Sequence, residues 1–240
     1  MTELTALSKE EIVFQRMQDF HCQRVSAVVA GDVPLEKREG GILVLHLIPE
    51  STVLTRSLLD STSLKEHGGR IRPLGELGGQ SRFNVDGFLN FVGDQKVRAY
   101  SQFFRDGRLE SVMSDVGYAV NHHVENPPLA IRSSLCERAV FDVIHDYLKV
   151  CKVIGIKPPI WMFSALVECE GFRMMTDRMF RDVSDKAVDR SPAILPELKI
   201  TSVDAEPQQL LRPWCDTLWQ ASGLERSFNY DQDGNWHEQR

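Results

Sequence analysis

The 240-residue chain lacks the motifs that mark common catalytic and nucleotide-binding sites. It contains no GxxxxGK[ST], GxGxxG, GxSxG or HExxH pattern, so ATP hydrolysis, dinucleotide binding and standard hydrolase chemistry have no sequence support. Its five cysteines are odd in number and widely spaced, with no CxxC pair, which favours neither a zinc ribbon nor a disulfide framework. We therefore expect no catalytic residue, no metal and no cofactor.

Long apolar runs and an excess of basic charge are also missing. No segment reaches the roughly 18 consecutive apolar residues of a membrane span, and residues 1–31 mix charged with apolar side chains. This pattern predicts a cytoplasmic protein without a membrane segment. The net charge of −6 disfavours nonspecific nucleic-acid binding by the chain alone. We expect a protein partner or a homo-oligomer, with nucleic acid reached through the partner.

The overall composition is that of an ordinary globular protein. Hydrophobic residues make up 42% and charged residues 26% of the chain, enough for a sizeable core. We treat residues 1–240 as a single α/β domain with an N-terminal helix at 8–31 and a C-terminal docking tail at 224–240. The predicted fold class is α/β or α+β: a mixed sheet with a central hairpin, flanked by about three helices.

The hairpin is predicted in the stretch 81–114, which has the densest turn chemistry of the chain. Asp106-Gly107 separates two β-prone runs at 98–104 and 108–113, and Asp-Gly is typical of a type I′ turn. Residues 84–87, Asn-Val-Asp-Gly, predict a second turn just before it. The hairpin should therefore lie in the middle of the sheet.

Other strands and connections follow from apolar runs and turn-forming residues. The continuous run 42–48 predicts a central strand covered on both faces, the run 160–167 a second buried strand, and residues 198–203 an edge strand. Residues 49–80 read as mostly loop with a possible short strand at 70–74. We place a connection at 115–128, which includes His122 and His123, and a surface excursion at 176–197.

Three helices are indicated by their start signals and apolar stripes. Ser8 and Glu11 have the spacing of a capping box before the helix at 8–31, and Ser134 and Glu137 repeat that spacing before a helix ending at Gly155. A third helix should begin near Pro207 and bury Trp214 and Trp219 on one face. The aromatic residues of the tail, Phe228, Tyr230 and Trp236, predict that it docks on the domain.

Several residues carry possible chemistry. His46 lies in an apolar strand, where it could be a general base or a core histidine bonded to backbone or carboxylate; we favour the core histidine. Asp86, Asp106 and Glu110 could be paired catalytic carboxylates, but we favour turn roles for the two aspartates and a solvated strand position for Glu110. The adjacent His21 and Cys22 fall in mid-helix, where nothing activates a thiolate.

Arginines are concentrated around the hairpin. Six lie within 39 residues, at positions 70, 72, 82, 98, 105 and 108, and could make a basic sheet face despite the acidic total. Arg98 is in phase with Tyr100, Gln102 and Phe104, and phosphate binding needs several cations on one face. The candidate binding residues are Arg82, Arg98, Arg105 and Arg108; an ordinary solvated strand surface is the alternative.

Five segments together resemble a known bacterial family: GGILVLHLIPES at 40–51, RPLG at 72–75, SRFNVDGFLNF at 81–91, FFRDGRLESV at 103–112 and LWQASGLERSFNYDQDGNW at 218–236. They are similar to the region downstream of the divergent AlbA domain in Schlafen-like proteins, often labelled ATP-binding or helix-turn-helix regulators. The likeness spans about residues 14–236, and the AlbA-type nucleic-acid-binding domain does not lie within it. It implies a fold and a nucleic-acid-linked setting, but no catalytic residue.

The function we expect is that of a non-enzymatic accessory or interaction module. It would serve a nucleic-acid-linked bacterial system, regulatory or defensive, in which a partner chain supplies the activity. The alternative is a metal-dependent nuclease or phosphate-ester hydrolase with its site near residues 82–110.

Overall fold

The computed structural model describes residues 8–55, 57–120, 127–177, 179 and 182–238. Their helices and strands form an α+β fold with two sheets, one of them mixed, which confirms the predicted fold class. Among these residues, no helix is both long and apolar enough to cross a membrane.

The larger sheet has seven antiparallel strands. Their order is β11 (Ala193–Ile200), β8 (Ile160–Val167), β1 (Ile42–Pro49), β5 (Leu109–Ser114), β4 (Val97–Phe104), β3 (Gly87–Gly93) and β2 (Gln80–Phe83). The smaller sheet has the order β10 (Asp182–Ala187), β9 (Arg173–Asp177), β7 (Leu129–Ile131) and β6 (Gly117–Ala119), with β7 parallel to β9.

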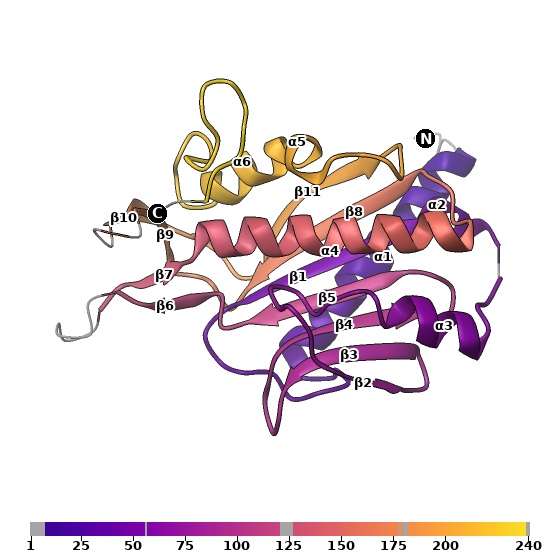
Figure 1. The fold of residues 1–240 in the computed structure, drawn as a ribbon. Coiled ribbons are helices and arrows are strands. Elements are labelled where there is room, and N and C mark those ends of the chain that lie inside the picture. The colour runs from indigo at the N-terminus through magenta and orange to yellow at the C-terminus, as the bar shows by residue number, and fades with distance from the viewer. Residues whose placement is uncertain (1–7, 56, 121–126, 178, 180–181, 239–240) are drawn as a thin grey trace, which may run out of the picture.

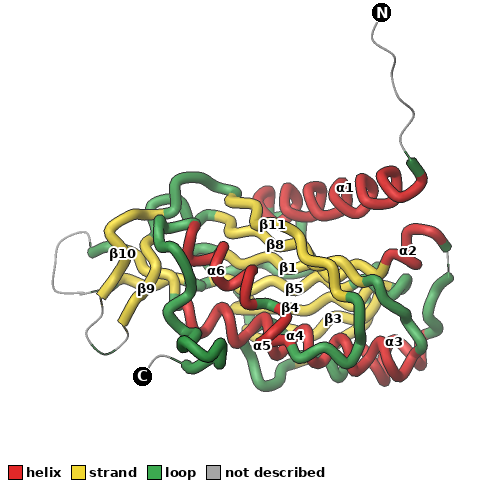
Figure 2. The backbone as a smooth tube through the Cα atoms, turned by 90° about the horizontal axis from the view of Figure 1, so that it is seen from above, coloured by secondary structure: helices red, strands yellow, loops and turns green. Residues whose placement is uncertain are grey.

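Helices cover both faces of the larger sheet (Figures 1 and 2). One face carries α1 (Lys9–Ala30), and the opposite face carries α4 (Ser133–Ile154) together with α3 (Ser61–Gly68), α5 (Pro207–Leu210) and α6 (Arg212–Gln220). The short α2 (Glu50–Leu54) directly follows β1. The sheet is thus the middle of three layers.

Strand β1 is the predicted central strand. All eight of its residues are buried, because Leu43, Leu45 and Leu47 belong to the core on the α4 side while Ile42 and Val44 belong to the core on the α1 side. Burial on both faces explains why the strand reads as a continuous apolar run rather than an alternating one.

The capping box at Ser8 is confirmed and the one at Ser134 is wrong. The Ser8 hydroxyl accepts from the Glu11 N–H, and the Glu11 carboxylate accepts from the Ser8 N–H. Helix α4 instead begins after Arg132 without a side-chain cap, because Glu137 is fully buried and is engaged by side chains of the C-terminal segment.

The predicted hairpin is confirmed as β4–β5, but the type I′ turn is wrong. Gly107 has a φ of +91°, whereas Asp106 is not left-handed, and type I′ needs positive φ at both central residues. The Gly107 N–H donates to the Phe104 carbonyl at 3.0 Å, and the Phe104 N–H donates to the Arg108 carbonyl at 2.9 Å. This pattern is a three-residue loop in which a type I turn is followed by a left-handed glycine.

Two segments predicted as irregular contain regular elements. Residues 49–80 hold α2 and α3, the latter capped by Asp60, and 70–74 is not a strand: Ile71 and Leu74 enter the core from a loop. Residues 176–197 include parts of β9 and β11 and all of β10. Register shifts in β10 and β11 break the alternation by which such strands are recognised in a sequence. His122 and His123 lie outside the described residues.

The C-terminal region buries the residues that were predicted to be buried, but it forms two short helices instead of the single predicted helix. Helix α5 starts at Pro207, and α6 starts anew at Arg212 with Pro213 in its first turn. Trp214 and Trp219 are buried as predicted. The tail docks through Tyr230, which is 4% exposed, and through Trp236, which packs on the α4-side core.

Candidate functional site

The four arginines predicted to bind phosphate do not form one basic face. Arg98 forms a salt bridge with Glu76, and Arg108 pairs with Asp106 at 2.6 Å and lies over the Phe20 ring. These two arginines lie at opposite ends of the β4–β5 hairpin, roughly 20 Å apart at about 3.3 Å per residue. Both cations are therefore engaged within the fold.

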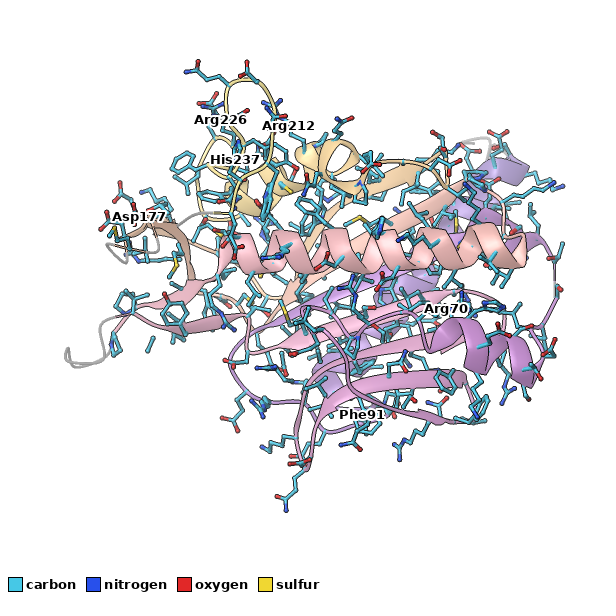
Figure 3. The ribbon with its side chains drawn as sticks, viewed as in Figure 1. Arg70, Phe91, Asp177, Arg212, Arg226 and His237 are labelled. Atoms are coloured by element: carbon cyan, nitrogen blue, oxygen red, sulfur yellow. The ribbon has the colours of Figure 1, made fainter. Side chains whose placement is uncertain are left out.

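The other two predicted arginines lie near β2 and have no carboxylate partner among the described residues. Arg105 donates to the backbone carbonyls of Asn84 and Val85 and so holds the turn after β2. Arg82 lies over the Phe91 ring at 5.8 Å. Figure 3 shows Phe91 far from Arg212 and Arg226 of the C-terminal segment. Arg82, which lies over Phe91, therefore does not share a basic patch with those two arginines.

Glu110, predicted to be solvated, is instead the centre of a buried network on the α1 side. Its side chain is 0% exposed. Arg24 donates to both carboxylate oxygens at 2.7 Å, Tyr100 donates at 2.8 Å, and His46 Nε2 lies 2.9 Å from Oε2. The network joins α1 to three strands, and His46 is confirmed as a core histidine bonded to a carboxylate.

Burial and the bonds from Arg24 and His46 act in opposite directions on the pKa of this carboxyl. Burial by itself raises the pKa of Glu110, but the hydrogen bonds from Arg24 and His46 and the positive charge of Arg24 lower it to about 2. Burial lowers the pKa of His21, beside His46, to about 3. At neutral pH Glu110 is thus an anion and His21 is neutral.

The contact between the two histidines fixes a chain of hydrogen bonds. Their Nδ1 atoms lie 2.8 Å apart, so one must donate and the other accept. The geometry fits an assignment in which His21 Nδ1 donates to His46, and His46 Nε2 donates to Glu110. His21 Nε2 is then left buried without a partner. The chain of hydrogen bonds therefore ends at a buried nitrogen inside the protein.

The carboxylates proposed for metal-dependent hydrolysis are not assembled. The Asp106 carboxylate accepts from the Arg108 N–H and Asp86 is exposed in the turn before β3, as predicted, while Glu110 is saturated by four hydrogen bonds from its three partners. The described part of the chain contains no group of three or more His, Cys, Asp or Glu that could hold a metal ion.

A second buried carboxylate, Glu137, was not anticipated. It accepts four hydrogen bonds from the C-terminal region: from Trp219 and Ser227 on one oxygen, at 2.8 and 2.7 Å, and from Asn229 and Trp236 on the other, at 2.7 and 2.6 Å. No described cation is in ion-pair contact with it, and burial raises its pKa despite the four bonds. Trp219 and Trp236 could have indicated a buried acceptor from the sequence, since a buried indole N–H needs a hydrogen-bond partner.

The β2 strand forms an open edge of the larger sheet. The Asn84 N–H donates to the Gly87 carbonyl at 3.0 Å, and bonded pairs alternate along an antiparallel ladder. Given the register Ser81–Asn90 and Phe83–Phe88, the backbone groups of Ser81 and Phe83 point away from β3. No described backbone group pairs with them.

The surroundings of this edge are partly apolar and partly basic. A groove of about 590 Å³ lies between α3 and β2, lined by Ser61, Thr62, Lys65, Glu66 and Phe83. Phe83 is 44% exposed and faces the α3 side, with its ring 5.0 Å from Phe88. Lys65 and Arg82 are exposed, and no described carboxylate forms a salt bridge with either.

The opposite edge of the sheet is protected. Strand β11 carries Pro196 at its middle and a register shift between Leu195 and Leu198. Proline removes a donor and a bulge twists the edge, and both features discourage the addition of another strand. Strand β2 has neither feature.

No protein-family model matches the chain, and searches of curated proteins and of solved structures find no match. The likeness to Schlafen-like proteins therefore stays a prediction from the residues that carry it.

Proposed function

We propose that this protein is a non-enzymatic binding module that captures an extended segment of a partner protein at the β2 edge. The observation that carries the proposal is the pair of free backbone positions, Ser81 and Phe83, beside an apolar groove. Their two N–H and two C=O groups offer four hydrogen bonds to an added strand, each worth about 1 kcal/mol net.

The chemistry of the edge defines the segment that would bind. Side chains of an added strand alternate between the two faces of the sheet. Those on the α3 side meet Phe83 and Lys65, and those on the α1 side meet Arg82. An apolar side chain in the groove and acidic side chains near the two cations complement this surface. A second copy of the chain fits less well, because its own Arg82 would face a like charge.

The biological setting is part of the same proposal. The resemblance to Schlafen-like proteins supports a nucleic-acid-linked bacterial system, regulatory or defensive, in which the captured partner supplies the activity. The net charge of −6 supports nucleic acid being reached through the partner rather than bound directly.

The test uses displayed random peptides selected on the purified protein, with the strongest binder synthesised. Ser81→Pro removes an outward-pointing N–H, whereas Ser81→Ala keeps it and is the matched control. We expect Ser81→Pro and Phe83→Glu to weaken binding by about tenfold or more, equivalent to about 1.4 kcal/mol, and Ser81→Ala to bind like wild type.

Equal binding by Ser81→Pro and Ser81→Ala would overturn the proposal, as would a selection that enriches no extended peptide. Thermal melts must show that Ser81→Pro and Phe83→Glu stay folded. For Ser81→Pro this is expected because the Ser81 N–H has no internal partner. Self-association in sedimentation that Ser81→Pro abolishes would make the edge a contact between copies and would also overturn the partner assignment.

A further inference from the structure

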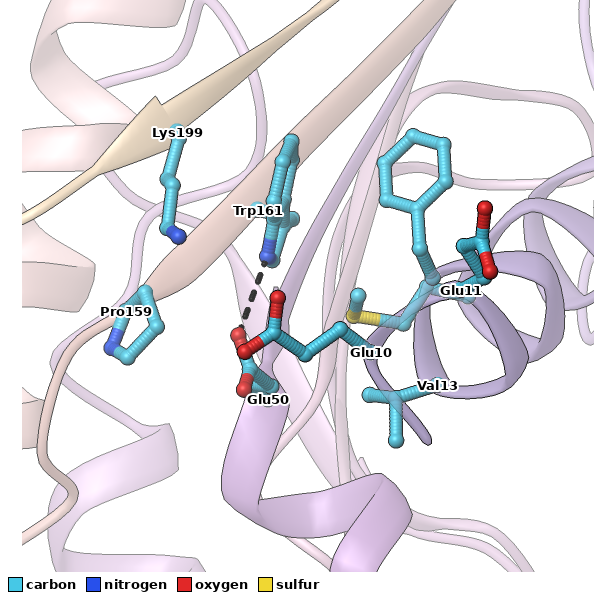
Figure 4. A pocket seen from close by; sticks show the side chains of 9 residues that line it. Glu10, Glu11, Val13, Glu50, Pro159, Trp161 and Lys199 are labelled. Carbon is cyan, nitrogen blue, oxygen red and sulfur yellow. Dashed lines mark hydrogen bonds between the residues drawn. The ribbon is translucent and has the colours of Figure 1, made fainter. Parts of the chain in front are cut away.

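A pocket of about 430 Å³ lies on the far side of the molecule from β2, where the first turn of α1 meets the ends of β8 and β11 (Figure 4). Its lining includes three carboxylates, two aromatic rings and one ammonium. They are Glu10, Glu11, Glu50, Phe14, Trp161 and Lys199. Figure 4 shows Glu10, Glu50, Trp161 and Lys199 directed toward a common space.

The aromatic wall is the distinctive part of this pocket. Trp161 is half-buried, and the Phe14 ring meets it edge-on with the centroids 4.8 Å apart. The indole N–H is directed at a Glu50 oxygen 3.5 Å away. The Lys199 ammonium lies 5.2 Å from the centroid of the Trp161 ring. The ring therefore already serves as a surface for a cation, since its face carries negative electrostatic potential.

The carboxylates leave an excess of negative charge around this ring. Acidic residues in the first turn stabilise a helix, and the Glu11 carboxylate is occupied by the Ser8 N–H at 2.6 Å. Glu10 and Glu50 form no salt bridge among the described residues. Two uncompensated carboxylates thus lie beside an aromatic wall and a single ammonium.

We infer that this pocket binds an alkylammonium group, either of a free amine or of a lysine side chain. Glu10 and Glu50 would neutralise the ligand's charge, while Phe14 and Trp161 would contact its alkyl chain. Lys199 is an internal competitor, because its ammonium occupies the Trp161 face and repels a second cation. The site is independent of the β2 edge.

The test measures binding of n-butylamine hydrochloride, with N-acetyl-lysine methylamide as a second ammonium and n-butanol as the uncharged control. The readout is the shift of the Trp161 indole resonance in amide-correlated NMR. We expect both ammonium compounds to bind, butanol to leave the resonance unmoved, and Ser81→Pro to change nothing. Tighter binding of the lysine compound would indicate a peptide source, and tighter binding of butylamine a free amine; either supports the site.

Two variants decide whether the charges act as inferred. Lys199→Met should tighten butylamine binding by about fivefold, because it removes a competing charge but keeps an unbranched side chain. Glu50→Gln should weaken binding by a similar factor. Equal responses to butylamine and butanol, or Lys199→Met binding no tighter than wild type, would overturn the inference.

Discussion

Glu110 and Glu137 are two buried carboxylates on opposite faces of one sheet, and each accepts four hydrogen bonds. Both are 0% exposed. Glu110 receives two of its bonds from the cation Arg24, whereas all four donors of Glu137 are uncharged side chains. The pKa of Glu110 falls to about 2, and the pKa of Glu137 rises.

The difference shows that saturating a buried carboxylate with hydrogen bonds from uncharged donors does not by itself keep its pKa low. Desolvation raises both pKa values. At Glu110 the hydrogen bonds from Arg24 and His46, together with the Arg24 charge, reverse the direction, whereas the four uncharged donors of Glu137 do not. Both residues do the same structural task, since Glu110 holds α1 on the sheet and Glu137 holds the C-terminal segment on α4. The contacts made by Glu110 and by Glu137 should therefore respond differently to substitution and to pH.

The largest effect is expected from Glu110→Gln. The amide keeps the shape but leaves the Arg24 charge without a counterion, which costs about 3–5 kcal/mol. For a chain of this size, that lowers Tm by roughly 10 °C. Urea unfolding followed by circular dichroism measures the loss, and a change below about 1 kcal/mol would contradict the role of the ion pair.

The same variant has a predictable pH dependence. Because the folded pKa of Glu110, about 2, lies below its ordinary 4.5, its stabilisation is fully present above pH 4.5 and is lost as the pH falls toward 2. The stability difference between wild type and Glu110→Gln should thus shrink in acid. A constant difference from pH 7 to pH 3 would show that charge is not its source.

Arg24→Met should convert the Glu110 site into one resembling Glu137. It removes the countercharge while keeping the stem that packs on the sheet, and we expect a loss of about 3 kcal/mol at pH 7. The pKa of Glu110, measured by carbon NMR of its carboxyl, should rise above its value in wild type. An unmoved pKa would mean that the remaining hydrogen bonds suffice, and the contrast with Glu137 would need another cause.

Glu137→Gln should cost less, about 1–3 kcal/mol, because no described cation loses its counterion when the carboxylate is replaced. Its pH dependence has the opposite sign. A raised folded pKa means that the stabilisation is fully present below pH 4.5 and is lost as the pH rises through the folded value. The penalty should be larger at pH 4 than at pH 8, as measured by urea unfolding. The reverse trend would show that Glu137 is held as an anion.

The smallest effect is expected from Tyr100→Phe. It removes one uncharged donor from Glu110 and leaves Arg24 and His46 in place, so the loss should be about 0.5–1.5 kcal/mol. Trp236→Phe makes the equivalent deletion at Glu137 and is the matched comparison. If Tyr100→Phe cost as much as Glu110→Gln, the Arg24 pair could not be the dominant contact.

The two Ser-x-x-Glu motifs show when a local sequence pattern is enough to predict a helix cap and when it is not. Ser8 and Glu11 lie at a solvent-exposed helix start, where no other described group bonds the Glu11 carboxylate, and they form the box that their spacing predicts. Ser134 and Glu137 have the same spacing, but the buried donors of the C-terminal segment take the carboxylate. Those donors lie 82 or more residues away, so the local pattern could not include them.

The arginines around the hairpin illustrate the same limit for the site. Their number and the phase of Arg98 with Tyr100 are visible in the sequence, but the pairings with Glu76 and Asp106 and the stacking of Arg108 on Phe20 depend on the fold. The open edge was missed for a related reason, since being the last strand of a sheet is a property of strand order.

Local signals alone determined the elements whose chemistry is complete within a few residues: α1 from its cap to Gly31, the buried runs of β1 and β8, and the β4–β5 hairpin around Gly107. Backbone conformation and apolar period act over short distances there, so neighbouring residues suffice. The tertiary structure decided the rest. It placed β2 at an edge, gave Glu110 a cation and left Glu137 without one among the described residues, because burial and charge depend on residues that only folding brings together.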